Sequence, residues 1–123
     1  MTAINFQAVP EFPKELDHLS KKFRYLKEDF EKFKKVLAST SFNFIPGNVR
    51  ISDLGINVKT PIYKLKHFRS RDFKGKGSKS GFRIIYAQIK EKDDDKIIFI
   101  EIYHKNNQEN HNIDRIKKYF EEI

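Results

Sequence analysis

The stretch from Phe82 to Tyr103, FRIIYAQIKEKDDDKIIFIEIY, consists of two apolar runs on either side of a charged turn. The first run, Phe82–Ile89, and the second, Ile97–Tyr103, are rich in Ile, Phe and Tyr, which favour β-strands. Lys92–Asp95 lies between them and has the composition of a surface turn. The stretch therefore predicts a β-hairpin whose two strands are central and well buried.

Shorter segments on both sides of this hairpin extend the predicted sheet. Ile62–Phe68, IYKLKHF, is a third strand, and Ile4–Val9 predicts a short strand near the start of the chain. The connection from Ser39 to Pro61 contains turn signals, and its length favours a short strand or turn within it. At the other end, Asn112–Ile123 has apolar residues at helical spacing, with Asn112 suited to the N-cap.

The N-terminal third carries an apolar stripe that recurs every three or four residues, which predicts an amphipathic helical region. Two forms remain open. One is a helical hairpin laid on a sheet; the other is a single bent helix, because Arg24-Tyr25 offers neither the Pro nor the Gly that would break it. Three heptads also permit a coiled coil. The stripe consists of Leu16, Leu19, Phe23, Leu26, Phe30, Phe33 and Leu37.

The order strand, helices, three antiparallel strands and helix defines one α+β domain over residues 1–123, with an N-terminal helical pair on a small antiparallel β-sheet and a C-terminal helix. The absence of cysteine excludes structural disulfides and Cys-based metal sites or nucleophiles. No apolar run approaches the ~18 residues of a membrane span. We expect a soluble, unexported protein of the cytoplasm with no membrane partner.

Basic charge is concentrated in one segment. Eight of the 25 basic residues and one of the 17 acidic residues, Asp72, lie between Lys64 and Arg83, so the segment carries +7 where the whole chain carries +8. This focus is typical of a surface that binds a polyanion. A solvated basic loop that only aids solubility is the alternative. The basic residues are Lys64, Lys66, Arg69, Arg71, Lys74, Lys76, Lys79 and Arg83.

Three short stretches of the predicted sheet can bring such residues together. Lys64 and Lys66 alternate onto one face of their strand. Arg83 begins the neighbouring strand, and Tyr103-His104-Lys105 ends the last one. Lysine, arginine and histidine can bind phosphate and transfer protons in RNA cleavage by a ribose 2′-OH. Each of these residues also has a structural interpretation that requires no function.

These structural interpretations differ between the residues. The two lysines suit an exposed strand edge. Arg83 suits an ion pair with Glu101, and Tyr103 suits the core or its rim. His104 and His111 suit the surface as well as a site.

Other cofactor chemistry lacks a matching pattern. The acidic residues form no spaced set for Mg²⁺, and no paired-histidine motif is present, so we expect neither a metal nor another cofactor. The segment from Gly75 to Gly81, GKGSKSG, has Gly and Ser in the manner of a phosphate-binding loop, but it lacks P-loop spacing and a following helix.

Several motifs resemble the RelE/ParE superfamily of toxins from type II toxin–antitoxin modules. They are Tyr63–Lys66, Ser80–Tyr86 and Ile100–Lys105, together with Lys21–Phe23 and Leu26–Phe30 in the helical region. The resemblance covers most of the chain. It implies a compact α+β fold and a metal-independent endoribonuclease, or mRNA interferase, that cuts mRNA at the ribosome. An antitoxin protein is the partner that it implies.

The resemblance also implies roles for individual residues. Lys64 and Lys66 match the strand lysines of the family, one for proton abstraction and both for charge stabilisation. Arg83 matches the phosphate-binding arginine, and Lys105 falls where RelE has a second arginine. His111 falls where RelE has a tyrosine, which suits proton transfer or base stacking.

The connection from Lys66 to Arg83 departs from RelE because it is longer and more basic. We expect its middle part to grip RNA, together with Tyr103 and His104 at the strand end. Two other functions remain open, a ParE-like inhibitor of DNA gyrase and a non-catalytic nucleic-acid-binding relative. The RNA-gripping residues expected in the connection are Arg69, Arg71, Lys74, Lys76 and Lys79.

Overall fold

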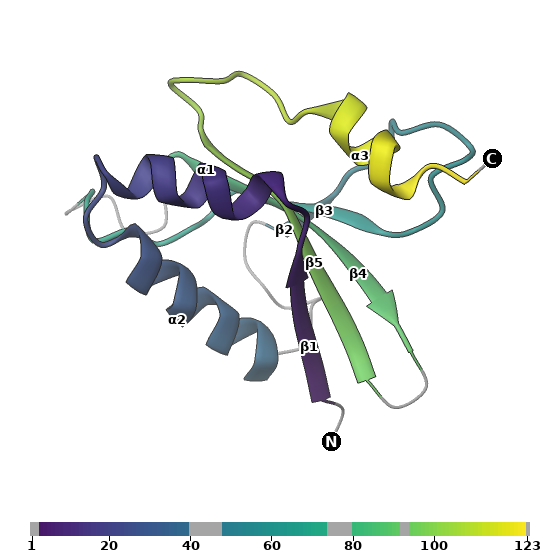
Figure 1. Ribbon diagram of the computed structural model, residues 1–123, viewed down its shortest axis with the longest axis horizontal. Helices are drawn as coiled ribbons and strands as arrows, with labels where there is room; N and C mark the ends of the chain where they lie inside the picture. The colour runs from purple at the N-terminus through teal and green to yellow at the C-terminus, as the bar shows by residue number, and fades with distance from the viewer. Residues whose placement is uncertain (1–2, 40–47, 74–79, 92–93, 123) are drawn as a thin grey trace.

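A five-stranded sheet forms the centre of the molecule (Figure 1). The computed structural model describes residues 3–39, 48–73, 80–91 and 94–122. The strand order is β1-β5-β4-β3-β2, so the β4–β5 hairpin lies in the middle, as the sequence predicts. The strands are β1 (Ala3–Ala8), β2 (Asn48–Arg50), β3 (Ile62–Leu65), β4 (Phe82–Lys90) and β5 (Asp94–His104).

The sheet is mixed, which corrects the prediction of an antiparallel one. β1 pairs parallel to β5, from Ala3 opposite Asp94 to Ala8 opposite Phe99, whereas the other pairs are antiparallel. Parallel neighbours need a long crossover connection, and here the chain between Ala8 and Asp94 passes through two helices and the other three strands. Nothing in the residues of β1 itself records that direction.

The helical region forms two helices, α1 (Glu11–Ser20) and α2 (Leu26–Ser39), which confirms the helical pair. The break between α1 and α2 contains no Pro or Gly, and a residue distant in the sequence stabilises it instead. Both carboxylate oxygens of Asp72 accept from the backbone N–H of Tyr25, at 3.2 and 3.4 Å. Since that N–H lies just before α2, the carboxylate provides a partner that the helix end lacks.

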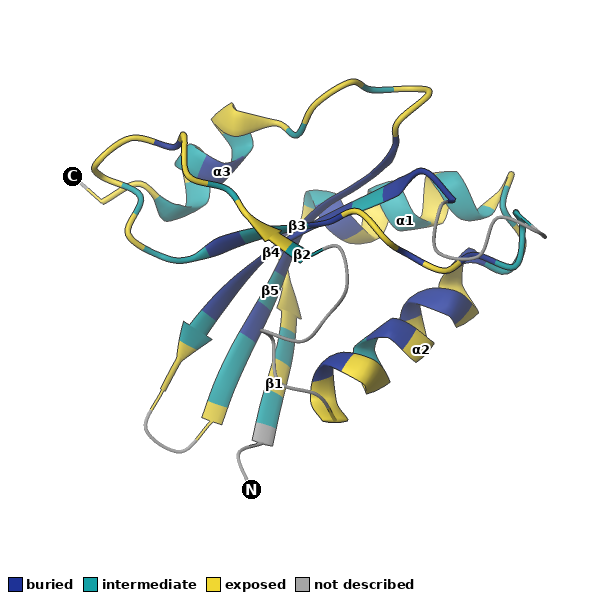
Figure 2. Ribbon diagram, turned by 180° about the vertical axis from the view of Figure 1, so that it is seen from behind, coloured by how far each residue is buried: buried dark blue, intermediate teal, exposed yellow. Residues whose placement is uncertain are grey.

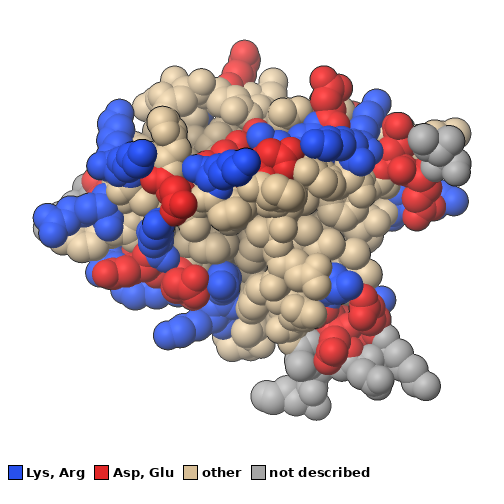
Figure 3. Space-filling view, viewed as in Figure 1, with Lys and Arg blue, Asp and Glu red and all other residues tan. Residues whose placement is uncertain are grey.

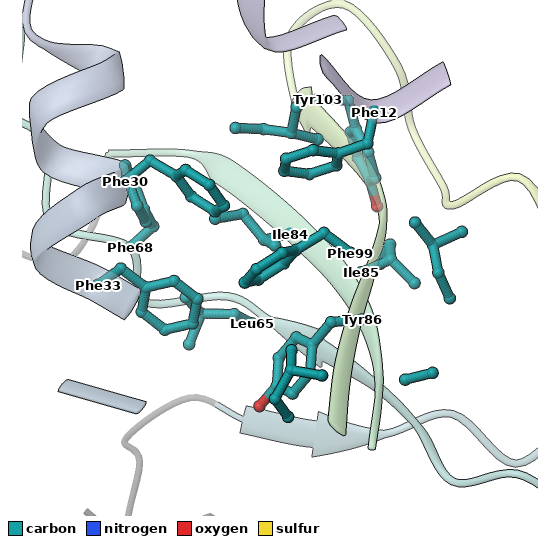
Figure 4. Close-up of a cluster of buried hydrophobic side chains, with 14 of the residues drawn as sticks. Phe12, Phe30, Phe33, Leu65, Phe68, Ile84, Ile85, Tyr86, Phe99 and Tyr103 are labelled. Atoms are coloured by element: carbon teal, nitrogen blue, oxygen red, sulfur yellow. The ribbon is translucent and has the colours of Figure 1, made fainter. Parts of the chain in front are cut away.

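The core lies between α2 and the sheet (Figure 4). Phe30 and Phe33 project from α2 towards the strands; Phe30 meets Phe99 edge-on at a centroid distance of 4.8 Å. Phe33 packs against Tyr86 of β4 and Phe68 beyond β3. The buried side of α2 faces the sheet and its exposed side faces outwards (Figure 2), as expected for an amphipathic helix.

A third helix, α3 (Ile113–Phe120), lies on the other side of the sheet from α2 (Figures 1 and 2). The Asn112 side chain accepts from the N–H of Arg115 at 3.0 Å, which confirms the predicted N-cap. Arg115 also donates to the carbonyl of Ile100, at 3.0 Å, and to Glu15 of α1, at 2.8 Å. One side chain thus joins α3 to β5 and to α1. None of the helices in the described residues is long and apolar enough to cross a membrane.

Candidate functional site

The strand register places four polar side chains on one face of the sheet. Lys64 lies opposite Ile85, which lies opposite Glu101 on β5. Two residues further along β4, Arg83 lies opposite Tyr103. Because side chains alternate along a strand, these residues lie on the face opposite Tyr86, whose ring packs against α2.

His111 joins this face from the connection between β5 and α3. Its electrostatic neighbours are Lys64 and Glu101, and Lys64 is in turn close to Lys66 and Arg83. The Arg83 guanidinium donates to the carbonyl of Lys66 at 3.1 Å, which fixes it against the end of β3. We call the set Lys64, Lys66, Arg83, Tyr103 and His111 the Lys64 cluster; the sequence predicts all five as site residues.

Burial and neighbouring charges prepare three members of the cluster for proton transfer or hydrogen bonding. Burial, then the cations Lys66 and Arg83, lower the pKa of Lys64, and Glu101 opposes them. Burial and Lys64 lower the pKa of His111, which favours its neutral ring. Burial and Glu101 raise the pKa of Tyr103 to about 12, so its hydroxyl stays a donor. The cluster therefore combines a lysine that gives up its proton more readily, a histidine that favours its neutral ring and a neutral hydroxyl donor.

Two polar atoms of the cluster are buried and find no hydrogen-bond partner among the described residues. They are the Tyr103 hydroxyl and His111 Nδ1. Tyr103 is only 5% exposed, and buried polar groups in folded proteins nearly always have a partner. Since both atoms lie next to cationic side chains, an anionic ligand with oxygen acceptors is the partner that fits.

Glu101 is the functional residue that sequence reasoning missed. The sequence offers it as an ion-pair partner for Arg83, whereas its oxygens accept from Gln108 and from the backbone of Asn112, each at 2.8 Å. The signal was present in IIFIEIY, where a single carboxylate interrupts a run of buried residues. Such a carboxylate has to be satisfied inside the fold.

His104 lies on the opposite face, away from the cluster. It stacks on Phe73 at 5.2 Å and meets Phe82 edge-on at 5.1 Å. Its Nε2 lies 2.9 Å from the carbonyl of Ser80, and its Nδ1 accepts from the N–H of Asn106 at 3.2 Å. Both ring nitrogens are therefore engaged with the backbone, and we do not retain His104 as an RNA-binding residue.

Lys105 lies at the same end of the sheet but at its margin. Its backbone N–H donates to the carbonyl of Gly81 at 2.9 Å, and its charge acts on His104. Within the described residues, its charge is not among those that shift the pKa of Lys64 or of His111. The catalytic role that the resemblance implies for Lys105 stays a prediction.

The basic connection between Lys66 and Arg83 is partly fastened to the helices. The Arg71 guanidinium pairs with Asp29 at 2.8 Å and with Glu28, and it lies over the Tyr25 ring. Its charge is thus engaged within the fold, in contrast to the expected grip on RNA, whereas Arg69 is exposed. The remaining predicted residues, Lys74, Lys76 and Lys79, lie outside the described residues.

On the face that Figure 3 shows, Lys and Arg side chains are interspersed with Asp and Glu. The function proposed below rests on the local chemistry of the Lys64 cluster. Among the described residues, no group of three or more His, Asp or Glu side chains has the arrangement of a metal site.

Comparison of the chain with protein-family models, curated proteins and solved structures gives no match, so the functional argument rests on the residues of the chain itself.

Proposed function

We propose that the protein is a metal-independent endoribonuclease that cleaves RNA by attack of a ribose 2′-OH on the adjacent phosphate. The observation that carries the proposal is that the Tyr103 hydroxyl and His111 Nδ1 are buried and have no hydrogen-bond partner among the described residues, with Arg83 acting on the first residue and Lys64 on the second. The phosphodiester of RNA supplies oxygens for the hydroxyl and for Arg83, and the adjacent ribose 2′-OH supplies the proton that His111 takes up.

The roles follow from the protonation states that the environment favours. The neutral His111 ring takes the proton from the 2′-OH as its oxygen attacks phosphorus. Lys64, whose lowered pKa makes it a stronger acid than an ordinary lysine, gives a proton to the departing 5′-oxygen. The products are a 2′,3′-cyclic phosphate and a 5′-OH. Arg83 and Tyr103 bind the non-bridging oxygens, where negative charge grows, and Lys66 adds a second cation.

The resemblance to RelE/ParE toxins extends the proposal to a biological setting. We infer that the substrate is mRNA at the ribosome in the cytoplasm, and that the protein is the toxin of a type II toxin–antitoxin module. A cognate antitoxin that covers the Lys64 cluster would then be its partner. The motifs quoted above support this step.

Expression without the antitoxin tests the proposal. Induction of the wild-type protein should stop growth and create new mRNA 5′ ends, and Arg83→Ala should abolish both effects. Lys35→Ala, which removes one exposed positive charge from α2, is the matched control and should behave as the wild type does. Normal growth under verified expression would refute the proposal. Inhibition of gyrase with mRNA left intact would favour the ParE-like alternative, and weakened RNA binding without any cleavage would favour the non-catalytic one.

A further inference from the structure

Glu101 is a buried carboxylate with an unusual set of partners. It is 2% exposed, as buried as Asp29, the other fully buried carboxylate among the described residues. Asp29 has the Arg71 guanidinium as a counter-ion at 2.8 Å. No ion pair to Glu101 occurs within the described part of the chain, and burying a carboxylate without a counter-ion opposes folding. Its hydrogen bonds therefore have to satisfy it.

Both oxygens of Glu101 are bound by one short segment. Oε2 accepts from the side-chain amide of Gln108, and Oε1 accepts from the backbone N–H of Asn112. The same Gln108 amide donates to the carbonyl of Asn110 at 2.7 Å, which closes the loop on itself. His111 lies between these attachment points, so the carboxylate fastens to the sheet the segment that carries it.

The charge of Glu101 acts on the groups around it from several elements. It raises the pKa of His111 and of Lys64, against the effect of burial. On its own strand it raises the pKa of Tyr103. From α3 and α1, Arg115 and Glu15 also face it: its charge raises the pKa of each.

We propose that Glu101 is a positioning residue, whose hydrogen bonds to Gln108 and Asn112 hold the segment that carries His111 over the face of the sheet where Lys64 lies. The inference rests on the proposed function for its catalytic meaning, but the placement of His111 can be measured without RNA. The residue itself does not touch substrate in this account. It acts through the 108–112 segment and through its charge.

A reciprocal exchange of side chains removes the charge of Glu101 together with one of its hydrogen bonds, and then returns both. In Glu101→Gln, the new amide can accept from Asn112 but presents its NH₂ group to the NH₂ group of Gln108, so one of the two hydrogen bonds is lost. Adding Gln108→Glu restores a donor–acceptor pair with residue 101 and returns the negative charge to the same pocket, although the hydrogen bond to the Asn110 carbonyl is lost. Glu91→Gln removes a carboxylate from the far end of the β4–β5 hairpin, where it pairs with Lys96 at 3.1 Å, and is the matched control.

The readout is the NMR titration of the His111 ring in the full-length protein, assigned with His111→Gln. The pKa of His111 should fall in Glu101→Gln, return towards the wild-type value in the double variant, and stay unchanged in Glu91→Gln. An unchanged pKa in Glu101→Gln would overturn the inference. If that variant does not fold, Gln108→Ala decides, because it removes one of the two hydrogen bonds and keeps the Glu101 charge: a shifted His111 titration supports the inference, and an unchanged one overturns it.

The rate of RNA cleavage as a function of pH gives a second readout. Removal of the Glu101 charge should shift the whole profile to lower pH, because the pKa values of His111 and Lys64 both fall. A slower reaction with an unshifted profile would show a merely structural role and would overturn the inference. Failure of the wild-type protein to cleave RNA would refute the proposed function alone, since the NMR titration reports the placement of His111 directly.

Discussion

Two histidines at the same end of the sheet illustrate how differently its two faces are used. His104 is the last residue of β5, lies among aromatic rings and has both nitrogens engaged with the backbone. His111 lies over the other face with a buried nitrogen that has no partner in the described residues and with Lys64 as a neighbour. One ring completes a core and the other is left able to take up a proton.

The difference between them comes from strand parity and from the connection after β5. His104 follows Tyr103 directly, so the two side chains point to opposite faces of the sheet. Beyond β5, the backbone N–H of Asn112 donates to Glu101, which fastens the segment next to His111 to the sheet. Residue type and nearness in sequence therefore do not identify the site residue, whereas the register does.

The largest expected effect comes from exchanging the two histidines for glutamine in turn. His111→Gln should lower the rate of RNA cleavage by roughly 10²–10⁴-fold, the usual contribution of a general base. Its free energy of unfolding should stay within about 0.5 kcal/mol of the wild-type value, because the ring lies outside the aromatic core. Cleavage assays and urea denaturation measure the two quantities.

His104→Gln should give the reverse pattern. It loses ring contacts in the core, so the free energy of unfolding should fall by about 1–3 kcal/mol. The cleavage rate of the fraction that stays folded should change little. Equal loss of activity in both variants, at equal stability, would contradict the assignment of His111 to the site and of His104 to the core.

Two glycines with positive φ provide the next largest effect. Gly81 has φ +92°, and a Cβ added there would lie 2.8 Å from His104 Nε2. Gly55 has φ +84° but no atom within 4 Å of such a Cβ. Gly81→Ala should therefore lower the free energy of unfolding by roughly 3 kcal/mol, and Gly55→Ala by about 1 kcal/mol from backbone strain alone. Thermal or urea denaturation of the pair measures the difference, and equal losses would contradict the packing around His104.

A smaller effect distinguishes two buried tyrosines. Tyr103→Phe removes a hydroxyl that lacks a partner among the described residues, so stability should be unchanged or higher by up to ~1 kcal/mol. Cleavage should slow about tenfold, the value of one hydrogen bond to a charged phosphate.

Tyr86→Phe is the matched control on the helix-covered face. Its hydroxyl donates to Asn48 at 2.6 Å, so its loss should cost about 1 kcal/mol of stability and leave cleavage unaffected. Denaturation and cleavage assays on both variants measure the change in stability and the change in activity of each. If the Tyr103→Phe protein is less stable than the wild type and equally active, the hydroxyl does not take part in RNA cleavage.

The smallest effect is the dependence of stability on pH. Burial lowers the pKa of His104 and of His111 below the ordinary value of 6.5. The unfolded chain therefore binds protons at a higher pH than the folded protein does. This part of the stability is complete above pH 6.5 and is lost as the pH falls towards the folded-state values. Urea denaturation measures how far the free energy of unfolding falls between pH 7 and pH 5. The fall should be smaller in His104→Gln and in His111→Gln than in the wild-type protein. A fall of the same size in both variants would contradict the lowered pKa values of the two histidines.

The strongly patterned parts of the fold could be predicted from the sequence. The apolar runs of β4 and β5, the stripe of α1 and α2, and the N-cap Asn112 each carry a local signal that the structure confirms. The parallel pairing of β1 and the break before α2 could not be predicted, since both depend on distant residues. Asp72 reaches Tyr25 across 47 positions, and no local pattern records that contact.

The same division holds for the candidate site. Lys64, Lys66 and Arg83 follow from strand alternation and from the focus of charge, and the structure brings them together. His104 and Arg71 lie outside this cluster because of their surroundings. His104 is packed among aromatic rings, and Arg71 is paired with carboxylates. Glu101 was visible as a lone carboxylate in an apolar strand, but its hydrogen bonds to the 108–112 segment were not.

The most direct test is cleavage of mRNA by the purified protein. The mRNA is supplied free and bound to translating ribosomes. Each reaction is run with and without a chelator that leaves the ribosome's own magnesium in place. The predicted products end in a 2′,3′-cyclic phosphate. A substrate with a 2′-deoxy nucleotide at the cut should give none, Arg83→Ala should give none, and His111→Gln should form them roughly 10²–10⁴-fold more slowly. Cleavage of the deoxy substrate, an undiminished rate in those variants, or intact mRNA under both conditions would contradict the proposed cleavage of RNA.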